Sequence, residues 1–250
     1  MTTAESRFAR VARLLSVLAH NEPGGLRLTE VVETVSLPKT SVHRMLDELS
    51  DAGLVSYEQS DQRYHVGDFI DFLSRAARER FDFRLRAQPL LQQMVDELGD
   101  TVYLMLVRDN RILCVERLLG DYPIQSLSLD VGDVRPMGVG SSGAIVASLL
   151  SPERFGSLMD SQVEERRALG IKDSQMLQIV AAARRDGYSF NRGTIVPGVS
   201  GVGVALVSPS GVPKGAVSLV ALNSRFANGR KLQVAKRLQK FAQEASVLLA

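Results

Sequence analysis

The stretch from residue 37 to residue 67 constrains the fold more than any other part of this chain. Apolar side chains recur in it at i, i+3, i+4 and i+7, namely Val42, Met45, Leu46 and Leu49. This spacing predicts an amphipathic helix over 38–50, and Gly53 suits its end. Two short strands are expected next, at 54–57 and 63–66, around the turn-forming sequence EQSD. A helix followed at once by a hairpin is therefore the pattern to explain.

Two further helical patterns precede this segment. The first carries an apolar stripe from Phe8 to Leu18 and ends near the breaker sequence NEPGG. The second covers 28–36, with Thr29 as its expected N-cap. Three helices, the last two joined by a short turn, and then a hairpin are the order of elements in a winged helix-turn-helix. We expect residues 1–67 to form a DNA-binding domain of this kind.

The front end of the 38–50 helix carries many hydrogen-bond donors. In a helix-turn-helix, the second helix of the pair enters the major groove, and its N-terminal residues reach base edges and phosphates. The residues expected to do so are Lys39, Thr40, Ser41, His43 and Arg44. Arg63, near the tip of the hairpin, is expected to add a minor-groove or phosphate contact. The alternative is that these side chains form only a solvated helix face.

Bulk charge does not favour nucleic-acid binding. The whole chain has a formal net charge of +2. Residues 1–67 hold seven Arg and Lys against nine Asp and Glu, which gives −2. A DNA-binding front end must therefore act through a few well-placed cations. The slightly acidic balance keeps open an alternative of another class, a sensor or scaffold that uses its winged helix to bind a protein partner.

Beyond the hairpin, residues 68–86 read as a connecting helix and residues 87–250 as a second domain. Helices are expected at 90–99, 141–150, 174–187 and 230–249. Strands are expected at 101–107, 112–119, 124–131, 201–208 and 215–222. Strands mixed with helices in this order are typical of an α+β sensor-like domain.

Both halves of the chain resemble one known family. LPKTSVHRML, the following AGLV and the later QRYHVG are similar to the DNA-binding domain of the IclR family of transcriptional regulators. GDTVYLMLVRDNRILCVERLLG, ARRDGYSFNRG and PGVSGVGVAL are similar to the effector domain of that family, in order and spacing. The resemblance implies a winged helix-turn-helix, a linker helix that helps to dimerise, and a GAF-like mixed α/β domain that binds a small metabolite. It also implies a homodimer or a dimer of dimers.

The sequence GVGSSG at 138–143 formally matches the dinucleotide motif G-x-G-x-x-G. A dinucleotide site needs a buried strand directly before the first glycine, whereas the preceding DVGDVRPM is polar and rich in turn residues. Small residues at a helix start still leave backbone N–H groups open to an anion. The resemblance implies that this loop borders the effector pocket, and we expect it to hold a carboxylate. The loop residues concerned are Gly138, Gly140, Ser141 and Ser142.

Other pocket residues follow from the resemblance by position. They are Met105, Asn191, Val199, Gly201, Ser218 and Val220. Many members of the family have an acidic residue where Asn191 stands, a cysteine where Gly201 stands and a glutamate where Thr194 stands. These departures predict an effector that is bulkier or more negatively charged than a two- or three-carbon acid. The alternative is that Gly201 only permits a bend and Asn191 only caps a turn.

Nothing in the sequence predicts catalysis. The three histidines, His20, His43 and His65, all lie in the first 67 residues, so the second domain offers no imidazole base. Cys114 lies in the apolar sequence ILCVE and is expected to be a structural thiol. The motifs H-E-x-x-H, C-x-x-C, G-x-S-x-G and Walker A do not occur. We predict no enzyme, no metal site and no cofactor.

The sequence also predicts a cytoplasmic protein with no membrane partner. Its apolar runs are far shorter than the ~20 residues that span a bilayer. The beginning, MTTAESRFARVARLL, lacks the features of a signal peptide, and a single cysteine fits a reducing compartment.

Together these observations predict a DNA-binding transcriptional regulator whose operator binding is modulated by a small organic acid. The expected partners are double-stranded DNA with a roughly palindromic operator, the effector, and further copies of the chain.

Overall fold

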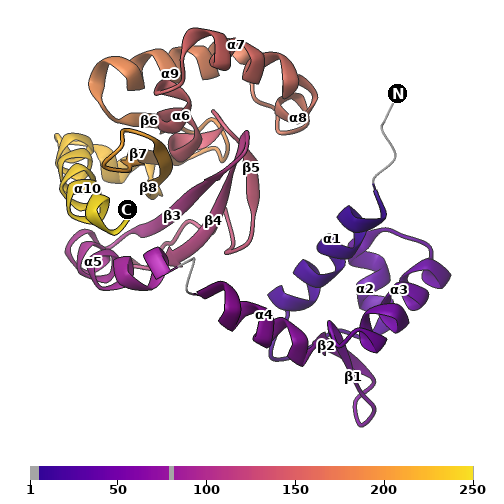
Figure 1. Cartoon of the computed structure of the whole chain (residues 1–250). Helices are drawn as coiled ribbons and strands as arrows, with labels where there is room; N and C mark the ends of the chain where they lie inside the picture. Colours follow the sequence, from indigo (N-terminus) through magenta and orange to yellow (C-terminus); the bar gives the residue numbers. More distant parts are fainter. Residues whose placement is uncertain (1–5, 79–81, 250) are drawn as a thin grey trace. The chain divides into compact units, whose positions relative to one another are not determined.

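The computed structural model describes residues 6–78 and 82–249. Contacts divide the chain into two compact units that meet between Asp82 and Phe83. Figure 1 shows the helical first unit in indigo and purple, and the sheet of the second unit with helices on both of its faces. In the described residues, no helix is both long and apolar enough to cross a membrane.

The first unit is a winged helix-turn-helix, as the sequence predicts. Its elements are α1 (Arg7–His20), α2 (Leu28–Val35), α3 (Lys39–Asp51), β1 (Val55–Glu58), β2 (Arg63–Val66) and α4 (Asp68–Arg78). The two strands pair antiparallel, with Val55 opposite Val66 and Glu58 opposite Arg63. One core holds the three helices and the hairpin together, and Leu14, Leu18 and Leu46 are among its fully buried members.

The start of α2 differs from the prediction. Its N-cap is Arg27 rather than Thr29, and the Arg27 N–H donates to Glu30 Oε2 at 2.7 Å. Because the Glu30 carboxylate already satisfies this helix end, no hydroxyl cap is needed. At the other end of α2, Ser36 adopts a left-handed conformation with φ 51°, which turns the chain directly into α3.

The second unit is built on a six-stranded antiparallel sheet. Its strands are β3 (Thr101–Arg108), β4 (Arg111–Leu118), β5 (Val134–Pro136), β6 (Ser189–Arg192), β7 (Val199–Val207) and β8 (Pro213–Leu222), in the order β5-β4-β3-β8-β7-β6. Its helices are α5 (Asp82–Leu98), α6 (Gly140–Ser148), α7 (Pro152–Ser161), α8 (Val163–Ala168), α9 (Asp173–Asp186) and α10 (Arg230–Ser246). The short 3-10 helices η1 (Asn223–Phe226) and η2 (Val247–Leu249) flank α10.

Each face of the sheet has its own core. Apolar side chains of β3, β7 and β8 pack with those of α5 and α10, and Phe241 is fully buried there. On the opposite face, α6 packs over β7 and β8, and α9 packs on α6 and β6, in a second core that includes Ile145 and Val180. A third cluster, which includes Tyr103, Met105 and Cys114, lies over β3 and β4.

The prediction of a strand at 124–131 is wrong. Residues 122–133, hereafter the strap, form no strand, and the third strand of this region is β5 instead. The strap carbonyls accept hydrogen bonds from side chains of the sheet, because Tyr103 Oη donates to Ser126 O at 2.7 Å and Arg117 Nη1 donates to Leu129 O at 2.9 Å. The strap therefore has its polar groups satisfied without a ladder.

The helices around the domain junction also differ from the expectation. The linker helix was expected over 68–86, whereas α4 ends at Arg78 and α5 already begins at Asp82 and contains Pro89. Residues 79–81 of the expected linker lie outside the described residues. The sequence analysis also did not predict α7 and α8, which lie between α6 and α9.

Candidate functional site

The exposed face of α3 carries the residues predicted to contact DNA. Lys39, Thr40, His43 and Arg44 are exposed and, with Asp47, line a shallow hollow in the surface, while Ser41 is half-buried. On the other face of α3, Val42, Met45, Leu46 and Leu49 are buried against α1, α2 and the hairpin, as the spacing predicts. The structure thus places the donors together at the beginning of one firmly packed helix.

Charges are unevenly distributed along α3. His43 Nδ1 lies 2.8 Å from an Asp47 carboxylate oxygen, and Arg44 Nε lies 3.9 Å from one of Glu48. Lys39 forms no ion pair with any described residue. Exposed pairs of this kind contribute only about 0–1 kcal/mol, so an incoming phosphate can replace them at little cost. The cationic end of α3 is its N-terminus, which is the end that reaches DNA in this motif.

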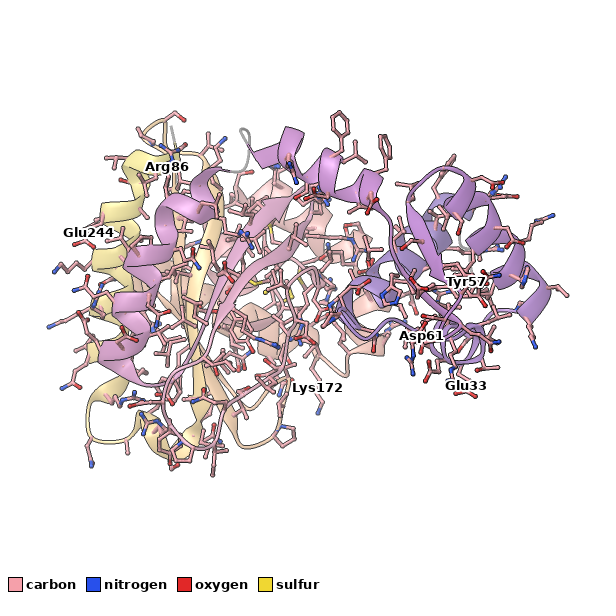
Figure 2. All side chains as sticks on the ribbon, turned by 90° about the horizontal axis from the view of Figure 1, so that it is seen from below. Glu33, Tyr57, Asp61, Arg86, Lys172 and Glu244 are labelled. Carbon is pink, nitrogen blue, oxygen red and sulfur yellow. The ribbon has the colours of Figure 1, made fainter. Side chains whose placement is uncertain are left out.

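Arg63 does not extend from the hairpin tip as the sequence analysis expected. Its guanidinium donates to the carbonyl oxygen of Gly25 at 2.9 Å and lies 3.5 Å from a Glu30 carboxylate oxygen. The side chain therefore fixes β2 to the connection between α1 and α2. The turn of the hairpin carries Asp61, and Tyr57 is exposed on β1 (Figure 2). The role of Arg63 in DNA binding stays a prediction that this geometry disfavours.

The second unit contains a partly enclosed cavity between the sheet, the strap and the beginning of α6. The space open to the centre of a water molecule is about 60 Å³. All of the predicted effector residues except Gly138 line it, namely Met105, Gly140, Ser141, Ser142, Asn191, Val199, Gly201, Ser218 and Val220. The structure thus brings together residues from α6 and from four strands. Their part in ligand binding stays a prediction.

The beginning of α6 lies unusually close to β7. A Cβ at Gly201 would lie 2.7 Å from Ser141 Oγ, and one at Gly203 would lie 2.7 Å from Ser141 O. Ser142 Oγ donates to Ser218 Oγ of β8 at 2.8 Å. No side chain caps α6, whose N-cap is Val139. The first N–H groups of this helix therefore face the cavity without a side-chain acceptor.

Asn191 combines two roles that the sequence analysis treated as alternatives. Its Oδ1 accepts a hydrogen bond from the Thr194 N–H at 3.2 Å, so it does cap a turn. The residue also lines the cavity and is 6% exposed. With Oδ1 fixed by this turn, the amide nitrogen is left as a neutral donor on the cavity wall.

Gly138 does not reach the cavity. It has φ +94°, and a Cβ at this position would lie 1.9 Å from the terminal methyl of Met176. The glycine is therefore needed for the turn that enters α6 and for the close packing of α9 over it.

Several residues of the cavity wall were not predicted from the sequence. They are Tyr103, Ile112, Ser128, Leu129, Arg135, Val139, Ile195, Val196 and Ser200. Ser128 and Leu129 belong to the strap, and Arg135 Nη2 donates to Ser128 O at 2.6 Å. The sequence signal that could have identified Arg135 is a charged residue inside VRP, a short sequence typical of a β-strand. Ile112 and Arg135 are paired across β4 and β5, which only the sheet order reveals.

The buried Cys114 thiol and the Tyr103 hydroxyl are poor candidates for reactive groups. Burial raises the pKa of the Cys114 thiol to about 12, so this side chain stays a thiol at neutral pH. Burial also raises the pKa of Tyr103, although its hydrogen bonds at the strap work in the opposite direction. Among the described residues, no group of three or more His, Cys, Asp or Glu side chains could hold a metal ion.

Comparison with known proteins assigns both units. Residues 9–59 match the IclR helix-turn-helix domain, and residues 75–247 match the C-terminal domain of the bacterial transcriptional regulator IclR. The chain belongs to the IclR family. It is 31% identical to the HTH-type transcriptional regulator Rv1719 of Mycobacterium tuberculosis, with 92% of this chain and 87% of that protein covered.

Two solved structures share the fold of this IclR-family chain. An IclR transcriptional regulator from Alicyclobacillus acidocaldarius is similar with a TM-score of 0.74 and 22% identity, over 97% of this chain and 98% of that one. An IclR homologue from Microbacterium hydrocarbonoxydans, solved in complex with 4-hydroxybenzoate, is similar with a TM-score of 0.72 and 21% identity, over 96% and 98%. The chain is therefore a DNA-binding transcriptional regulator by family, and its relatives are described as regulators rather than enzymes.

Proposed function

We propose that this regulator changes its affinity for one or a few operators when a small organic acid occupies the cavity of its second unit. The observation that carries the proposal is the cavity wall. It contains the uncapped beginning of α6 and neutral donors from serine and asparagine, and no carboxylate among the described lining residues. Such a wall favours an anion, because N–H groups and the helix dipole are directed at it without a competing negative charge.

The homologue in complex with 4-hydroxybenzoate supports an organic acid as the class of ligand. The wall of this cavity also supports an effector larger than a two- or three-carbon acid. Apolar side chains from β3, β4, β7 and the strap line much of it, and a two-carbon acid offers little apolar surface to bury against them.

DNA reading is assigned to the exposed beginning of α3. In this proposal Lys39 and Arg44 supply the positive charge, and Thr40, Ser41 and His43 supply neutral hydrogen-bonding groups. The helix would enter the major groove with its N-terminal residues against base edges and phosphates. Effector binding would shift the chain between states of different operator affinity.

We also propose that the regulator acts as a homodimer or a dimer of dimers on a roughly palindromic operator. Support comes from α4, on which Phe69 and Phe72 stack at 5.8 Å between ring centroids although both are exposed. Exposed neighbouring aromatic rings of this kind mark surfaces that bury themselves against a partner. A symmetric pair of reading helices predicts two half-sites one helical turn, or a multiple of it, apart.

One experiment tests the DNA and effector parts together. The purified chain is incubated with fragments of DNA from its own source, and the retained fragments are sequenced, with and without a metabolite extract. We expect enrichment of one or a few palindromic sites, and a change in their occupancy on adding the extract. Binding that falls steeply with added salt would agree with phosphate contacts. Retention of no fragment above background in either condition would contradict the proposal.

A further inference from the structure

Arg135 is the only charged residue that lines the cavity in the part of the chain that the structure describes. It lies in the middle of β5, opposite Ile112 of β4, and its side chain is half-buried. It forms no ion pair with a described carboxylate, and its one hydrogen bond to a described residue is the donation from Nη2 to Ser128 O at 2.6 Å. The other donors of the guanidinium are therefore available to a ligand.

A half-buried cation that forms no ion pair is costly to maintain. Burial lowers the pKa of Arg135 below its usual value, and the nearby Asp133 charge offsets this only in part. The guanidinium stays charged at any physiological pH. An anion that enters the cavity would compensate this desolvated charge, and a carboxylate matches the planar fork of an arginine with two parallel hydrogen bonds.

The remaining wall is neutral and mostly apolar. Aliphatic side chains contribute most of it, namely Met105, Ile112, Leu129, Val139, Ile195, Val196, Val199 and Val220. The neutral polar groups include Ser142 and Ser218, which bond to each other, and Asn191 on β6. Arg135 and Asn191 come from the two opposite edge strands of the sheet. A ligand with a second carboxylate would find no second cation here, only the uncapped beginning of α6.

We propose that Arg135 is the anion receptor of this cavity and that the ligand is a monocarboxylate with an apolar aromatic or branched body. This inference rests on the proposed function and makes its ligand class specific. The acid pairs with Arg135, the apolar body packs against the aliphatic wall, and the serine and asparagine groups accept or donate to any hydroxyl or carbonyl substituent.

The test uses acids paired with their neutral amides. Isothermal titration calorimetry of the full chain would compare benzoate, phenylacetate and 3-methylbutanoate with their carboxamides, and with acetate and succinate. We expect at least one of the three larger acids to bind at least tenfold more tightly than its amide, than acetate and than succinate. In R135Q the acid should lose at least tenfold in affinity while the amide changes little, and R135K should retain part of the preference.

R117Q is the matched control. Arg117 donates to Leu129 O of the same strap and pairs with Asp130, but it does not line the cavity. If Arg135 served only to hold the strap, R135Q and R117Q would weaken acid and amide alike, and that result would overturn the proposal. A preference for acid that survives in R135Q, tightest binding by succinate, or no binding by any of the three larger acids would overturn it as well.

A measurement of operator binding in the absence of ligand distinguishes failure of the Arg135 inference from failure of the proposed function. Suppose that the chain selects operators and responds to a metabolite extract, but gives one of the overturning results above. That outcome refutes the Arg135 inference alone. A chain that binds a monocarboxylate through Arg135 but retains no DNA refutes the proposed function and leaves the ligand class standing.

Discussion

A Cβ at position 201 would lie 2.7 Å from Ser141 Oγ, too close for packed atoms, so Ser141 would have to move to admit a side chain there. The backbone of Gly201 is not in the left-handed region, so a bend does not explain the glycine. Its absent side chain lets the first turn of α6 rest on β7 and directs the N–H groups of that turn to the cavity. This close approach, rather than a bend, is a physical reason for a glycine here, and the bulkier effector that the sequence predicts stays a prediction.

Gly201→Ala should therefore destabilise the second unit by about 1–3 kcal/mol, since the added methyl must displace Ser141. Urea unfolding followed by circular dichroism measures this. Gly156→Ala is the control, because this glycine lies within α7 and its added Cβ would meet no atom within 4 Å. The control should gain about 0.5–1 kcal/mol. Equal effects of the two substitutions would show that the contact with Ser141 does not matter.

The two principal cations of α3 should behave differently. Arg44→Ala should weaken operator binding by about 1–3 kcal/mol and relax the preference at one base pair, if its guanidinium contacts a base edge. Lys39→Ala should weaken binding to all sequences alike and lower the salt slope by about 1, as expected for a phosphate contact. Fluorescence anisotropy with operator variants at several salt concentrations measures both. Unchanged affinity in both variants would remove this helix from the DNA interface.

Individual residues also show which parts of the candidate site could be predicted from the sequence and which could not. Ser141, Ser142 and Gly140 were found because they form a local motif at a helix start. Arg135 was missed because its importance arises from a pairing across the sheet and from a strap carbonyl, and neither is visible locally. Arg63 was expected at the tip of the wing, yet carbonyl groups more than thirty residues earlier in the chain accept from it.

At the scale of elements, the local sequence pattern predicted α1, α2, α3, α6, α9 and the β7–β8 hairpin well. It failed for the strap, where IQSLSLDV has the alternation of a strand but its ladder is replaced by donors from Tyr103, Arg117 and Arg135. Ile124 and Leu127 of this segment stay exposed, so their apolar character does not reflect a core. Alternation alone cannot distinguish a ladder from such side-chain anchoring.

The hairpin is also anchored by an acid whose effect depends on pH. Glu22, between α1 and α2, accepts from the Val66 N–H at 2.8 Å and lies 3.1 Å from His65 Nδ1. Burial alone would raise its pKa, but these hydrogen bonds and the His65 charge lower it below the ordinary 4.5. A lowered pKa in the folded state means that the stabilisation is present above the unfolded pKa and is lost as the pH falls through the folded value.

Glu22→Gln should therefore be less stable than the unaltered chain at pH 5.5, and the difference should shrink as the pH falls through the lowered folded-state pKa of the carboxylate. Urea unfolding at several pH values measures the difference. Glu33→Gln on the exposed face of α2 is the control and should show little difference at any of them (Figure 2). If the difference in unfolding free energy between Glu22→Gln and the unaltered chain widened on acidification, that result would contradict the anchoring role.

At the scale of the whole molecule, self-association should depend on α4. Phe72 is 61% exposed and Phe69 is 44% exposed, and burial of one phenylalanine contributes about 1.5–3 kcal/mol. Phe72→Ser should thus raise the dimer dissociation constant by about 10- to 100-fold in sedimentation velocity. Phe8→Ser, at an 83% exposed position of α1, should leave it unchanged. A chain that is monomeric at all concentrations, or equal effects of both substitutions, would contradict the proposed dimer.

The order of strands has a consequence for the timing of synthesis. The winged unit is complete within its own short span, so it can fold as soon as it leaves the ribosome. β3 pairs with β4 at once, but its other neighbour, β8, is translated roughly one hundred residues later. At about 5–20 residues per second, β3 lacks its neighbour β8 for about 5–20 s, and one of its edges stays unpaired during that time. During that interval the nascent second unit is exposed to aggregation and to chaperones, whereas the DNA-reading unit beside it is already finished.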